Sequence, residues 1–365
     1  MNSQHQKKYN IAIIGCGRIS KRHVDSLFKL KEKCKIIALC DNNEERLAKA
    51  RDYTKAIYES CGEDTPILYT KYEDFLNSCA KSDINIDLAV ITTPSGNHAS
   101  QVIAAANVGL NVCTEKPMAT RWRDGLSMVK ACDEAGVKLF VVKQNRFNPT
   151  IQALKKEIEN GSFGKIAMIT SNVFWQRPQE YYDQDDWRGT WEFDGGALMN
   201  QASHYVDLMQ WLVGPVESVN CSTATIDRNI EVEDTATVQL KYRSGALGSM
   251  AVTMLTYPEN IEGSISILGT KGTAILGGKA LNKIDHWEFD DSLNTVEDIK
   301  KINYIPSTIY GNGHTPFYDN VFKMLGKESS MDVIDGREGL KSLELLIGAY
   351  RSAREGKVIH LPLDF

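Results

Sequence analysis

The stretch Ile11-Ala-Ile-Ile-Gly15-Cys-Gly17-Arg18-Ile19-Ser20 joins an apolar, strand-like run to the start of a predicted helix. A glycine at position 15 permits a tight turn, and one at position 17 lets a phosphate approach the backbone. Unpaired N–H groups at the helix start attract negative charge. Ser20 stands where the third glycine of the dinucleotide fingerprint is usual, so that the match is incomplete.

An acidic residue after the next strand completes the pattern. Asp41 follows the apolar run Ile36–Cys40, and a carboxylate at that position accepts hydrogen bonds from ribose hydroxyls and repels a 2′-phosphate. The alternative is a solvated acid in a turn with Asn42 and Asn43. Together the strand, glycine turn, helix and acid predict dinucleotide binding, with NAD preferred over NADP.

The first half of the chain alternates strand-like and helical runs, the pattern of a parallel sheet covered by helices. The segment 53–82 is harder to assign. We therefore predict a Rossmann domain over residues 1–146. The expected strands are Asn10–Gly15, Lys35–Cys40, Ile86–Thr92, Leu110–Thr114 and Lys138–Lys143, and the expected helices are Ser20–Lys31, Asn97–Val108 and Trp122–Ala135.

The second half of the chain has a different order of predicted strands and helices. After a helix near Thr150–Asn160 and a strand at Lys165–Phe174, further strands follow one another with glycine-containing turns, and Asp234–Tyr242 alternates apolar with semi-polar residues. This pattern predicts an open, mostly antiparallel sheet with helices on one side. Residues 147–365 are thus expected to form an α+β domain for substrate binding and oligomerisation. Its last helix, 336–355, is expected to pack back towards the first domain before a final strand near 358–362.

Bulk composition excludes several classes of protein. A length of 365 residues favours two domains, and a net charge of -5 with a pI near 5.9 argues against binding to nucleic acid or an anionic membrane. The eight cysteines include no CxxC pair, and residues 1–10 lack the apolar core of a signal peptide. We expect a reduced, cytoplasmic protein without a metal site.

Three further motifs resemble the glucose–fructose oxidoreductase / inositol dehydrogenase family in order and spacing. They are Thr92-Thr93-Pro94-Ser-Gly-Asn97-His98, Glu115-Lys116-Pro117, and Gly195-Gly-Ala-Leu-Met-Asn200-Gln-Ala-Ser-His204. The resemblance implies that Lys116 lies beside the nicotinamide and that His204 works with an acid four residues earlier. The cofactor-binding residues expected from the glycine turn and this resemblance are Gly15, Gly17, Arg18, Ile19, Asp41, Thr93, Pro94, Asn97, His98, Glu115, Lys116 and Gln144.

The chemistry of alcohol oxidation gives matching roles. A hydroxyl must lose its proton while hydride leaves carbon; Lys116 can polarise the oxygen, and His204, with an ordinary pKa near 6.5, can accept the proton. Asn200 occupies the position of the family's acid, four residues before His204 and on the same face of a regular helix. Its amide cannot ionise, so it is expected to position a hydroxyl or the nicotinamide amide. Asp207 is expected to orient a neighbour or form a salt bridge.

Aromatic-rich segments suggest the substrate. The runs 172–182 and 187–196 resemble the family's UDP-N-acetyl-2-amino-2-deoxyglucuronate dehydrogenase branch, which oxidises carbon 3 of a UDP-linked sugar acid for bacterial surface polysaccharides such as O-antigen. Arginine and lysine suit the diphosphate and the carboxylate, although each could be a plain exposed charge. The substrate-binding residues expected are Lys116, Lys143, Asn145, Arg146, Arg177, Tyr181, Arg188, Asn200, His204 and His314, the last with Tyr318 at the lip of the nucleotide pocket.

Two alternatives share most of these features. A dehydrogenase of a free sugar or cyclitol would keep the cofactor site with Lys116 and His204, whereas a cofactor-binding sensor would keep only the glycine turn. Trp187 and Trp191, like Tyr181, could stack on a ligand or fill a core. The resemblance further implies a homo-oligomer, with a tetramer as the expected state.

Overall fold

The computed structural model describes residues 8–58, 65–290, 299, 301–306, 311–328 and 334–364, and the chain divides into two compact units. Unit 1 contains Met1–Val142 and His314–Leu340, and unit 2 contains Lys143–Gly313 and Lys341–Phe365. This division differs from the expected one in two places. Residues 143–146 belong to unit 2, and a late segment of the chain returns to unit 1.

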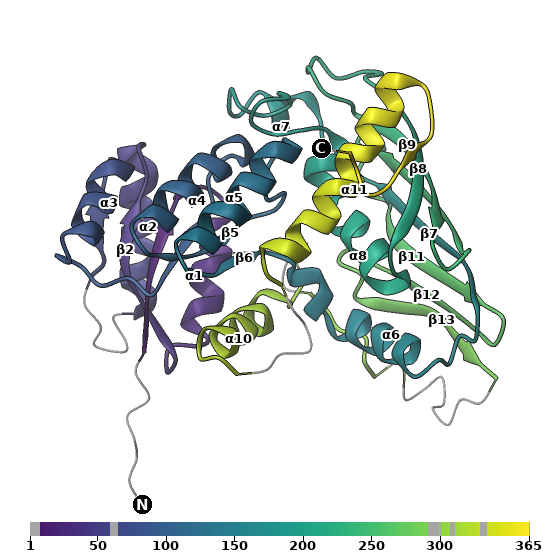
Figure 1. Cartoon of the computed structure of the whole chain (residues 1–365), viewed down its shortest axis with the longest axis horizontal. Helices are drawn as coiled ribbons and strands as arrows, with labels where there is room; N and C mark the ends of the chain where they lie inside the picture. Colours follow the sequence, from purple (N-terminus) through teal and green to yellow (C-terminus); the bar gives the residue numbers. More distant parts are fainter. Residues whose placement is uncertain are drawn as a thin grey trace, which may run out of the picture. The chain divides into compact units, whose positions relative to one another are not determined.

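Unit 1 is built on a six-stranded parallel sheet in the order β3-β2-β1-β4-β5-β6 (Figure 1). Its central strands are continuously apolar in sequence because helices cover both faces of the sheet. This is the predicted Rossmann fold, and its strand order reverses between β1 and β4, where ligands bind in such sheets. The strands are β1 (Tyr9–Ile14), β2 (Cys34–Cys40), β3 (Ile67–Tyr69), β4 (Leu88–Ile91), β5 (Asn111–Thr114) and β6 (Leu139–Val141).

Two helices of unit 1, α2 and α3, lie in or beside the segment 53–82 that sequence patterns leave unassigned. α2 buries only three of its residues and α3 only Phe75, so their apolar periodicity is weak. α10 packs against α1 and completes unit 1 from the far end of the chain. The helices are α1 (Ser20–Phe28), α2 (Glu44–Tyr58), α3 (Tyr72–Ala80), α4 (His98–Asn107), α5 (Trp122–Glu134) and α10 (His314–Leu325).

Unit 2 contains an eight-stranded sheet in the order β13-β12-β11-β7-β10-β9-β8-β14. β7 and β10 pair in parallel, and the other neighbouring pairs are antiparallel. The predicted, mostly antiparallel open sheet is therefore confirmed. The strands are β7 (Ile166–Phe174), β8 (Val216–Ala224), β9 (Thr235–Tyr242), β10 (Leu247–Thr253), β11 (Glu262–Gly269), β12 (Gly272–Gly277), β13 (Lys283–Phe289) and β14 (Ile359–His360).

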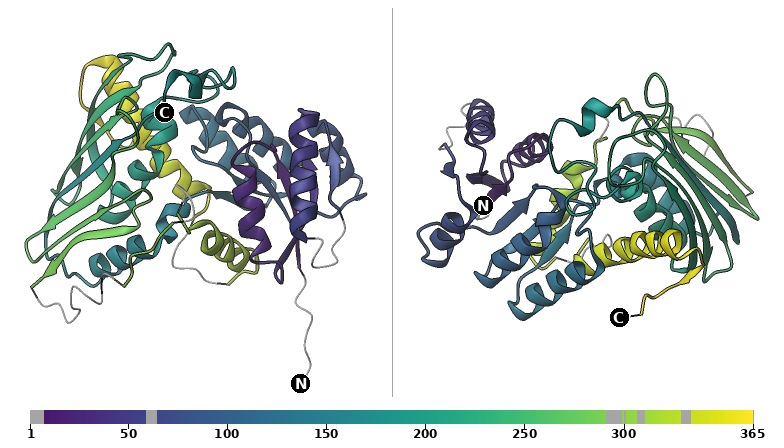
Figure 2. Two further views of the ribbon diagram at one scale, coloured as in Figure 1. Left: turned by 180° about the vertical axis from the view of Figure 1, so that it is seen from behind. Right: turned by 90° about the horizontal axis from the view of Figure 1, so that it is seen from above.

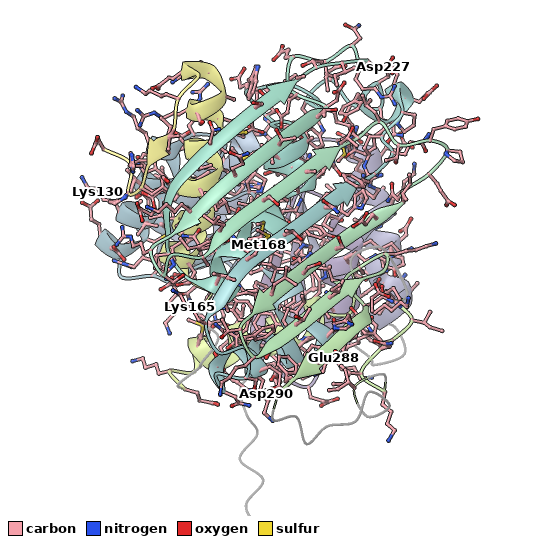
Figure 3. The ribbon with its side chains drawn as sticks, turned by 90° about the vertical axis from the view of Figure 1, so that its right-hand side faces the viewer. Lys130, Lys165, Met168, Asp227, Glu288 and Asp290 are labelled. Carbon is pink, nitrogen blue, oxygen red and sulfur yellow. The ribbon has the colours of Figure 1, made fainter. Side chains whose placement is uncertain are left out.

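Helices cover one face of this sheet (Figure 2). Along β9 the residues alternate between buried and exposed, and the buried ones, such as Val238, share an apolar space with Met209 of α8 and Leu345 of α11. The opposite face carries Met168, which Figure 3 labels, and its neighbour Leu247 on the adjacent strand, each more than a third exposed. The helical elements are α6 (Pro149–Glu159), α7 (Gln179–Tyr182), a π-helix (Ala197–Gln201), α8 (Ser203–Val213) and α11 (Gly336–Glu355).

Among the residues that the structure describes, no helix is long and apolar enough to cross a membrane.

Candidate active site

The glycine turn after β1 has the geometry of a nucleotide loop. Gly15 has φ +92°, and a Cβ there would lie 2.8 Å from the backbone nitrogen of Thr93, so glycine is required by the chain itself. A Cβ on Gly17, in contrast, would meet no described atom within 4 Å, so the chain's own packing does not require glycine there. Asp41 accepts the Cys16 N–H at 2.6 Å, which places the acid of β2 beside this turn.

His98 is held within unit 1 and joins two of the predicted cofactor segments. Its Nδ1 lies 2.9 Å from the Pro117 carbonyl oxygen and its Nε2 lies 2.9 Å from that of Thr93. Burial lowers its pKa, so the neutral ring donates to one carbonyl at a time. The ring thus supports the two segments from inside. The other expected cofactor residues of this region are partly or fully exposed. They are Gly17, Arg18, Ile19, Thr93, Pro94 and Asn97.

Lys116, whose side chain is half-buried, follows a carboxylate that faces the interior. Glu115 Oε2 accepts the Lys116 backbone N–H at 2.9 Å, and Oε1 lies 2.9 Å from His23 Nε2. Burial raises the pKa of Glu115, but the His23 hydrogen bond and the charge of Lys116 outweigh it and hold the pKa well below its usual range. The expected cofactor contact of Glu115 is replaced by internal hydrogen bonds.

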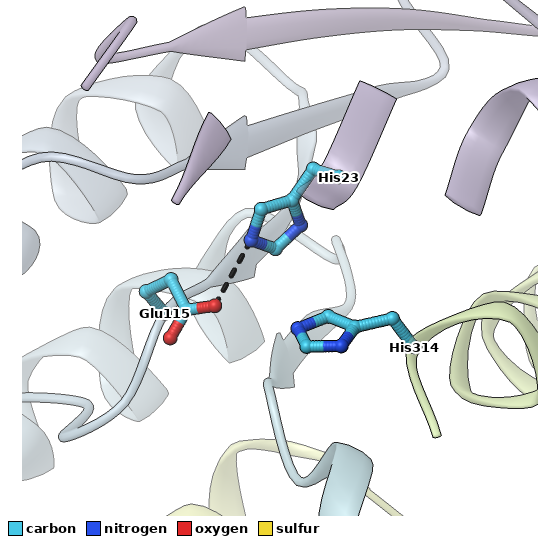
Figure 4. A group of neighbouring side chains, drawn as sticks. All are labelled: His23, Glu115 and His314. Atoms are coloured by element: carbon cyan, nitrogen blue, oxygen red, sulfur yellow. Dashed lines mark hydrogen bonds and ion pairs between the residues drawn. The ribbon is translucent and has the colours of Figure 1, made fainter. Parts of the chain in front are cut away.

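His314 lies in the same buried cluster, which corrects its expected place at a pocket lip. It is 4% exposed, and its ring is nearly perpendicular to that of His23 with the centroids 5.6 Å apart. Figure 4 shows His23, Glu115 and His314 turned towards one another. The turn at 311–313 does lead into a helix, as expected, but the first residue of that helix, His314, is buried inside unit 1.

His204 belongs to unit 2, near the start of α8, and its partner is another predicted site residue. Its Nε2 lies 2.8 Å from the amide nitrogen of Gln144. An amide N–H donates, so the ring nitrogen accepts and holds no proton. The Nε2 lone pair of His204 is therefore engaged by Gln144, and Nε2 can take up a proton only when that amide moves away. Gln144 supports His204, and its buried Oε1 has no hydrogen-bond partner in the described part of the chain.

Asn200 is positioned by an acid that the sequence analysis missed. It lies in the π-helix, and the next helix begins only after Ala202 with φ −94° and ψ 0°, so the predicted single regular helical face with His204 is wrong. The amide nitrogen of Asn200 donates to Asp194, whose other oxygen accepts the Gly189 N–H at 2.8 Å. Asp194 is buried, so a carboxylate does lie next to the position that lacks one.

Two of the predicted substrate cations are committed elsewhere. Arg146 contacts both oxygens of Asp207 at 2.8 Å, and Lys143 Nζ lies 2.9 Å from the same carboxylate, with all three side chains buried. Burial raises the pKa of Asp207, but the two cations outweigh it and hold the pKa well below its usual range. The predicted salt bridge of Asp207 is confirmed. Lys143 and Arg146 are corrected from substrate cations to its partners.

Two further predicted cations, Arg177 and Arg188, lie beside Tyr181, and Arg188 also pairs with Asp185 at 3.2 Å. Arg188 donates to the Tyr181 hydroxyl at 2.8 Å, and its guanidinium carbon lies 4.4 Å from the centre of the Trp187 ring. Arg177 donates to the side chain of Gln201 at 3.0 Å, and Gln201 is the residue after Asn200. Trp191 is 50% exposed. Asn145 lies in a short 3₁₀ helix, Gln144–Phe147, and is half-buried.

Two family models together match most of the chain. Residues 9–143 match the NAD-binding Rossmann fold of an oxidoreductase family, and residues 155–361 match its C-terminal α/β domain. These ranges fall in the two halves that the sequence pattern distinguishes.

Relatives of known activity and structure fit the same picture. The solved WlbA dehydrogenase of Bordetella pertussis, in complex with NADH and UDP-GlcNAcA, is 52% identical, with a TM-score of 0.89 over 98% of this chain and 99% of that one. The corresponding enzyme of Chromobacterium violaceum, with the same ligands, is 52% identical, with a TM-score of 0.87 over 99% and 98%. More distant is D-apiose dehydrogenase of Paraburkholderia graminis, 24% identical over 97% of this chain and 90% of its own.

Proposed function

Because this chain belongs to the oxidoreductase family that combines an NAD-binding Rossmann fold with a C-terminal α/β domain, we propose that it oxidises UDP-N-acetylglucosaminuronic acid. The product is the 3-keto sugar, a precursor of bacterial surface polysaccharide. The observation that carries this proposal is the 52% identity over nearly the whole chain to two dehydrogenases that bind NADH and this sugar nucleotide.

The residues of unit 1 fit an NAD cofactor. Gly17 leaves open space at the start of α1 where a pyrophosphate can approach the backbone, and Asp41 lies beside it to accept the ribose hydroxyls. When bound, NAD supplies the acceptor for the hydride that leaves the sugar. Titration of NAD and NADP should give tighter binding of NAD, because Asp41 repels a 2′-phosphate. Equal affinities would contradict this assignment of Asp41.

His204 and Lys116 carry the proton chemistry in this proposal. Before substrate binds, the Gln144 amide donates to His204 Nε2 at 2.8 Å. In this proposal the 3-hydroxyl replaces that amide and gives its proton to Nε2, while the Lys116 ammonium stabilises the negative charge that develops on the hydroxyl oxygen. His204→Gln and Lys116→Met should each lower kcat about 100-fold, the scale of general acid–base catalysis, while NADH binding measured by fluorescence changes little. Near-normal turnover of either variant would remove that residue from the mechanism.

Anionic groups of the substrate require cations, and Arg177 and Arg188 are the candidates once Lys143 and Arg146 are assigned to Asp207. Both arginines lie beside Tyr181, whose ring can stack on a sugar or base. A cation left without its anion in a desolvated site costs several kcal/mol. We therefore expect the neutral UDP-N-acetylglucosamine to be used about 100-fold less efficiently or worse.

One assay tests the function as a whole. NADH formation is followed by absorbance with UDP-N-acetylglucosaminuronic acid, with UDP-N-acetylglucosamine and with free sugars and inositols at matched concentrations. Turnover of the first substrate alone is the expected result. Equal turnover of the two UDP-sugars would contradict recognition of the carboxylate, whereas turnover of free sugars only would make the chain a sugar or cyclitol dehydrogenase. NADH binding without turnover of any compound would indicate a sensor.

The proposed assembly is a homotetramer in which the open face of the unit 2 sheet pairs subunits. Its support is the partial exposure of Met168, Leu247 and Leu268 on β7, β10 and β11. Light scattering after gel filtration measures the assembly mass directly. Leu247→Lys should shift a tetramer to smaller species, because a buried lysine at a paired sheet face is costly.

A further inference from the structure

A chain of hydrogen bonds inside unit 1 ends at the backbone of Lys116. The hydroxyl of Tyr318 lies 2.5 Å from His23 Nδ1, His23 Nε2 lies 2.9 Å from Glu115 Oε1, and Glu115 Oε2 accepts the Lys116 N–H at 2.9 Å. The exposed fractions of His23 and Tyr318 are 0% and that of Glu115 is 7%. The chain therefore joins α10, α1 and the end of β5 out of reach of bulk water.

The proton positions along this chain follow from its two ends. Burial raises the pKa of Tyr318 well above its usual range, so the hydroxyl keeps its proton and donates it to His23 Nδ1. Glu115 is ionised and can only accept, so His23 Nε2 carries the ring proton and donates it. Each group then donates or accepts as its chemistry allows, and no charged histidine is required.

Two members of this chain, His23 and Glu115, form a cluster with His314. All three side chains are of types that bind metal ions, and their candidate ligand atoms lie within 4.8 Å of one another. However, both nitrogens of His23 and both oxygens of Glu115 already have hydrogen-bond partners in the protein. A metal ion would have to displace His23 from Glu115. The hydrogen-bonded arrangement is therefore the better explanation of the cluster.

We propose that His23 is a positioning residue that sets the place of Lys116 by holding the Glu115 carboxylate against the Lys116 backbone. This inference rests on the proposed role of Lys116. Glu115 has no freedom to move while His23 and the Lys116 amide hold its two oxygens. A catalytic lysine displaced by about 1 Å can lose a large part of its effect.

The first turn of α10 makes two contacts with His23 within unit 1. His314 and Tyr318, four residues apart on one helical face, both reach His23.

Paired variants of His23 in the full-length protein test the proposal. His23→Leu removes the donor to Glu115, whereas His23→Gln keeps an N–H donor of similar reach. We expect kcat to fall about 10- to 100-fold in His23→Leu, with the Kd for NADH nearly unchanged, and to recover largely in His23→Gln. Hydrogen exchange by mass spectrometry should show faster exchange of the Lys116 amide in His23→Leu and slower exchange again in His23→Gln.

A matched control separates positioning from loss of packing. Val321→Ala removes part of a fully buried side chain of α10 and should lower the melting temperature while leaving kcat and the Lys116 amide exchange as they are. Unchanged kcat and exchange in His23→Leu, or equal losses in His23→Leu and His23→Gln, would overturn the proposal. Loss of activity in EDTA with recovery in Zn²⁺ would replace it by a metal site.

The exchange measurement needs no substrate, so it distinguishes this inference from the proposed function. If Lys116→Met remained active, the catalytic role of Lys116 would fail even with the exchange pattern as expected. If Lys116→Met were inactive but His23→Leu were normal in both measurements, the proposed function would stand and the positioning role would fail.

Discussion

Two buried carboxyl groups in unit 2 lie beside the segment that carries Asn200 and His204, and they differ in their partners. Asp207, on α8, is 3% exposed and pairs with two cations, which hold its pKa well below the usual range. Glu233 is also 3% exposed, yet burial raises its pKa to about 7, and hydrogen bonds from Leu198 and Tyr350 offset only part of the rise. Burial alone therefore does not decide the charge of a carboxyl group; the neighbouring charges do.

The difference bears on the catalytic segment. Glu233 Oε1 accepts the Leu198 N–H and the Tyr350 hydroxyl, both at 2.8 Å, whereas Oε2 has no hydrogen-bond partner among the described residues. A Cβ on Gly196 would lie 1.8 Å from that Oε2, so the carboxyl group directly contacts the start of the π-helix. The ion pair on α8 thus keeps a constant charge. The π-helix, in contrast, contacts a carboxyl group that titrates near neutral pH.

Removing the charge of Asp207 should have the largest effect. Asp207→Asn leaves Lys143 and Arg146 buried without their anion, and such a loss costs about 3–5 kcal/mol. Because the pKa of Asp207 is lowered in the folded state, its stabilisation is present above the ordinary pKa of aspartate and is lost in acid. Urea unfolding at pH 7 should show the full deficit, and the gap to the unmodified protein should narrow below pH 4. A deficit under 1 kcal/mol at pH 7 would contradict the assigned ion pairs.

The corresponding change at Glu233 should do the opposite. The folded pKa of about 7 lies above the ordinary value of 4.5, so this group contributes stability below pH 4.5 that is lost as pH rises to 7, about 3 kcal/mol in total. Glu233→Gln removes this pH dependence and should be as stable as the unmodified protein, or more so, at pH 8. Denaturant titrations from pH 5 to 8 measure the slope, and equal slopes for the two proteins would contradict the raised pKa.

A smaller loss of stability is expected when the positive charge beside Asp207 is kept but the two-point pairing geometry is lost. Arg146→Lys preserves the cation beside Asp207 yet replaces two aligned N–H donors by a single ammonium group. We expect a loss of about 1–2 kcal/mol at pH 7, well below that of Asp207→Asn. If the two variants were equally destabilised, pairing geometry rather than charge would govern this site.

The smallest change concerns Tyr350. Tyr350→Phe removes the hydrogen bond to Glu233 and the acceptor of the Met199 N–H. Each hydrogen bond is worth about 1 kcal/mol, and the one to Glu233 somewhat more when the acceptor is ionised. The loss should therefore be greater at pH 8 than at pH 5. In combination with Glu233→Gln the two effects should not add, because the residues are in contact. Full additivity would indicate that the hydroxyl acts elsewhere.

The parts of the fold and site that sequence patterns predicted are those with local signals. Gly15, Gly17 and Asp41 follow apolar strands directly, so their positions at strand ends could be read without knowledge of the fold. α2 and α3 bury too few apolar residues to show helical periodicity. Tertiary packing, which no local window contains, holds such elements in place.

The errors at the site concern buried polar residues with distant partners. Arg146 was expected at the substrate, but its partner Asp207 lies 61 positions later, and nothing local distinguishes a buried arginine from one that binds an anion. His23 was overlooked because its partner Tyr318 lies 295 positions away. The one available signal was that His23 is a polar residue on the inner face of a predicted helix and has no obvious ligand there. Asp194 was missed because Asn200, rather than the acid beside it, occupied the family position.

The late return of α10 has a consequence for biosynthesis. When residues 1–142 emerge from the ribosome, the nascent Rossmann sheet is complete, but more than half of the chain is still untranslated. His23 and the surface of α1 around it then lack Tyr318 and the rest of α10, which pack on them in the finished protein. Domains generally fold as units in the order of synthesis, yet unit 1 cannot finish until the Lys143–Gly313 segment of unit 2 has been made. The turn that carries Lys116 therefore acquires its full set of supporting contacts only as translation nears its end.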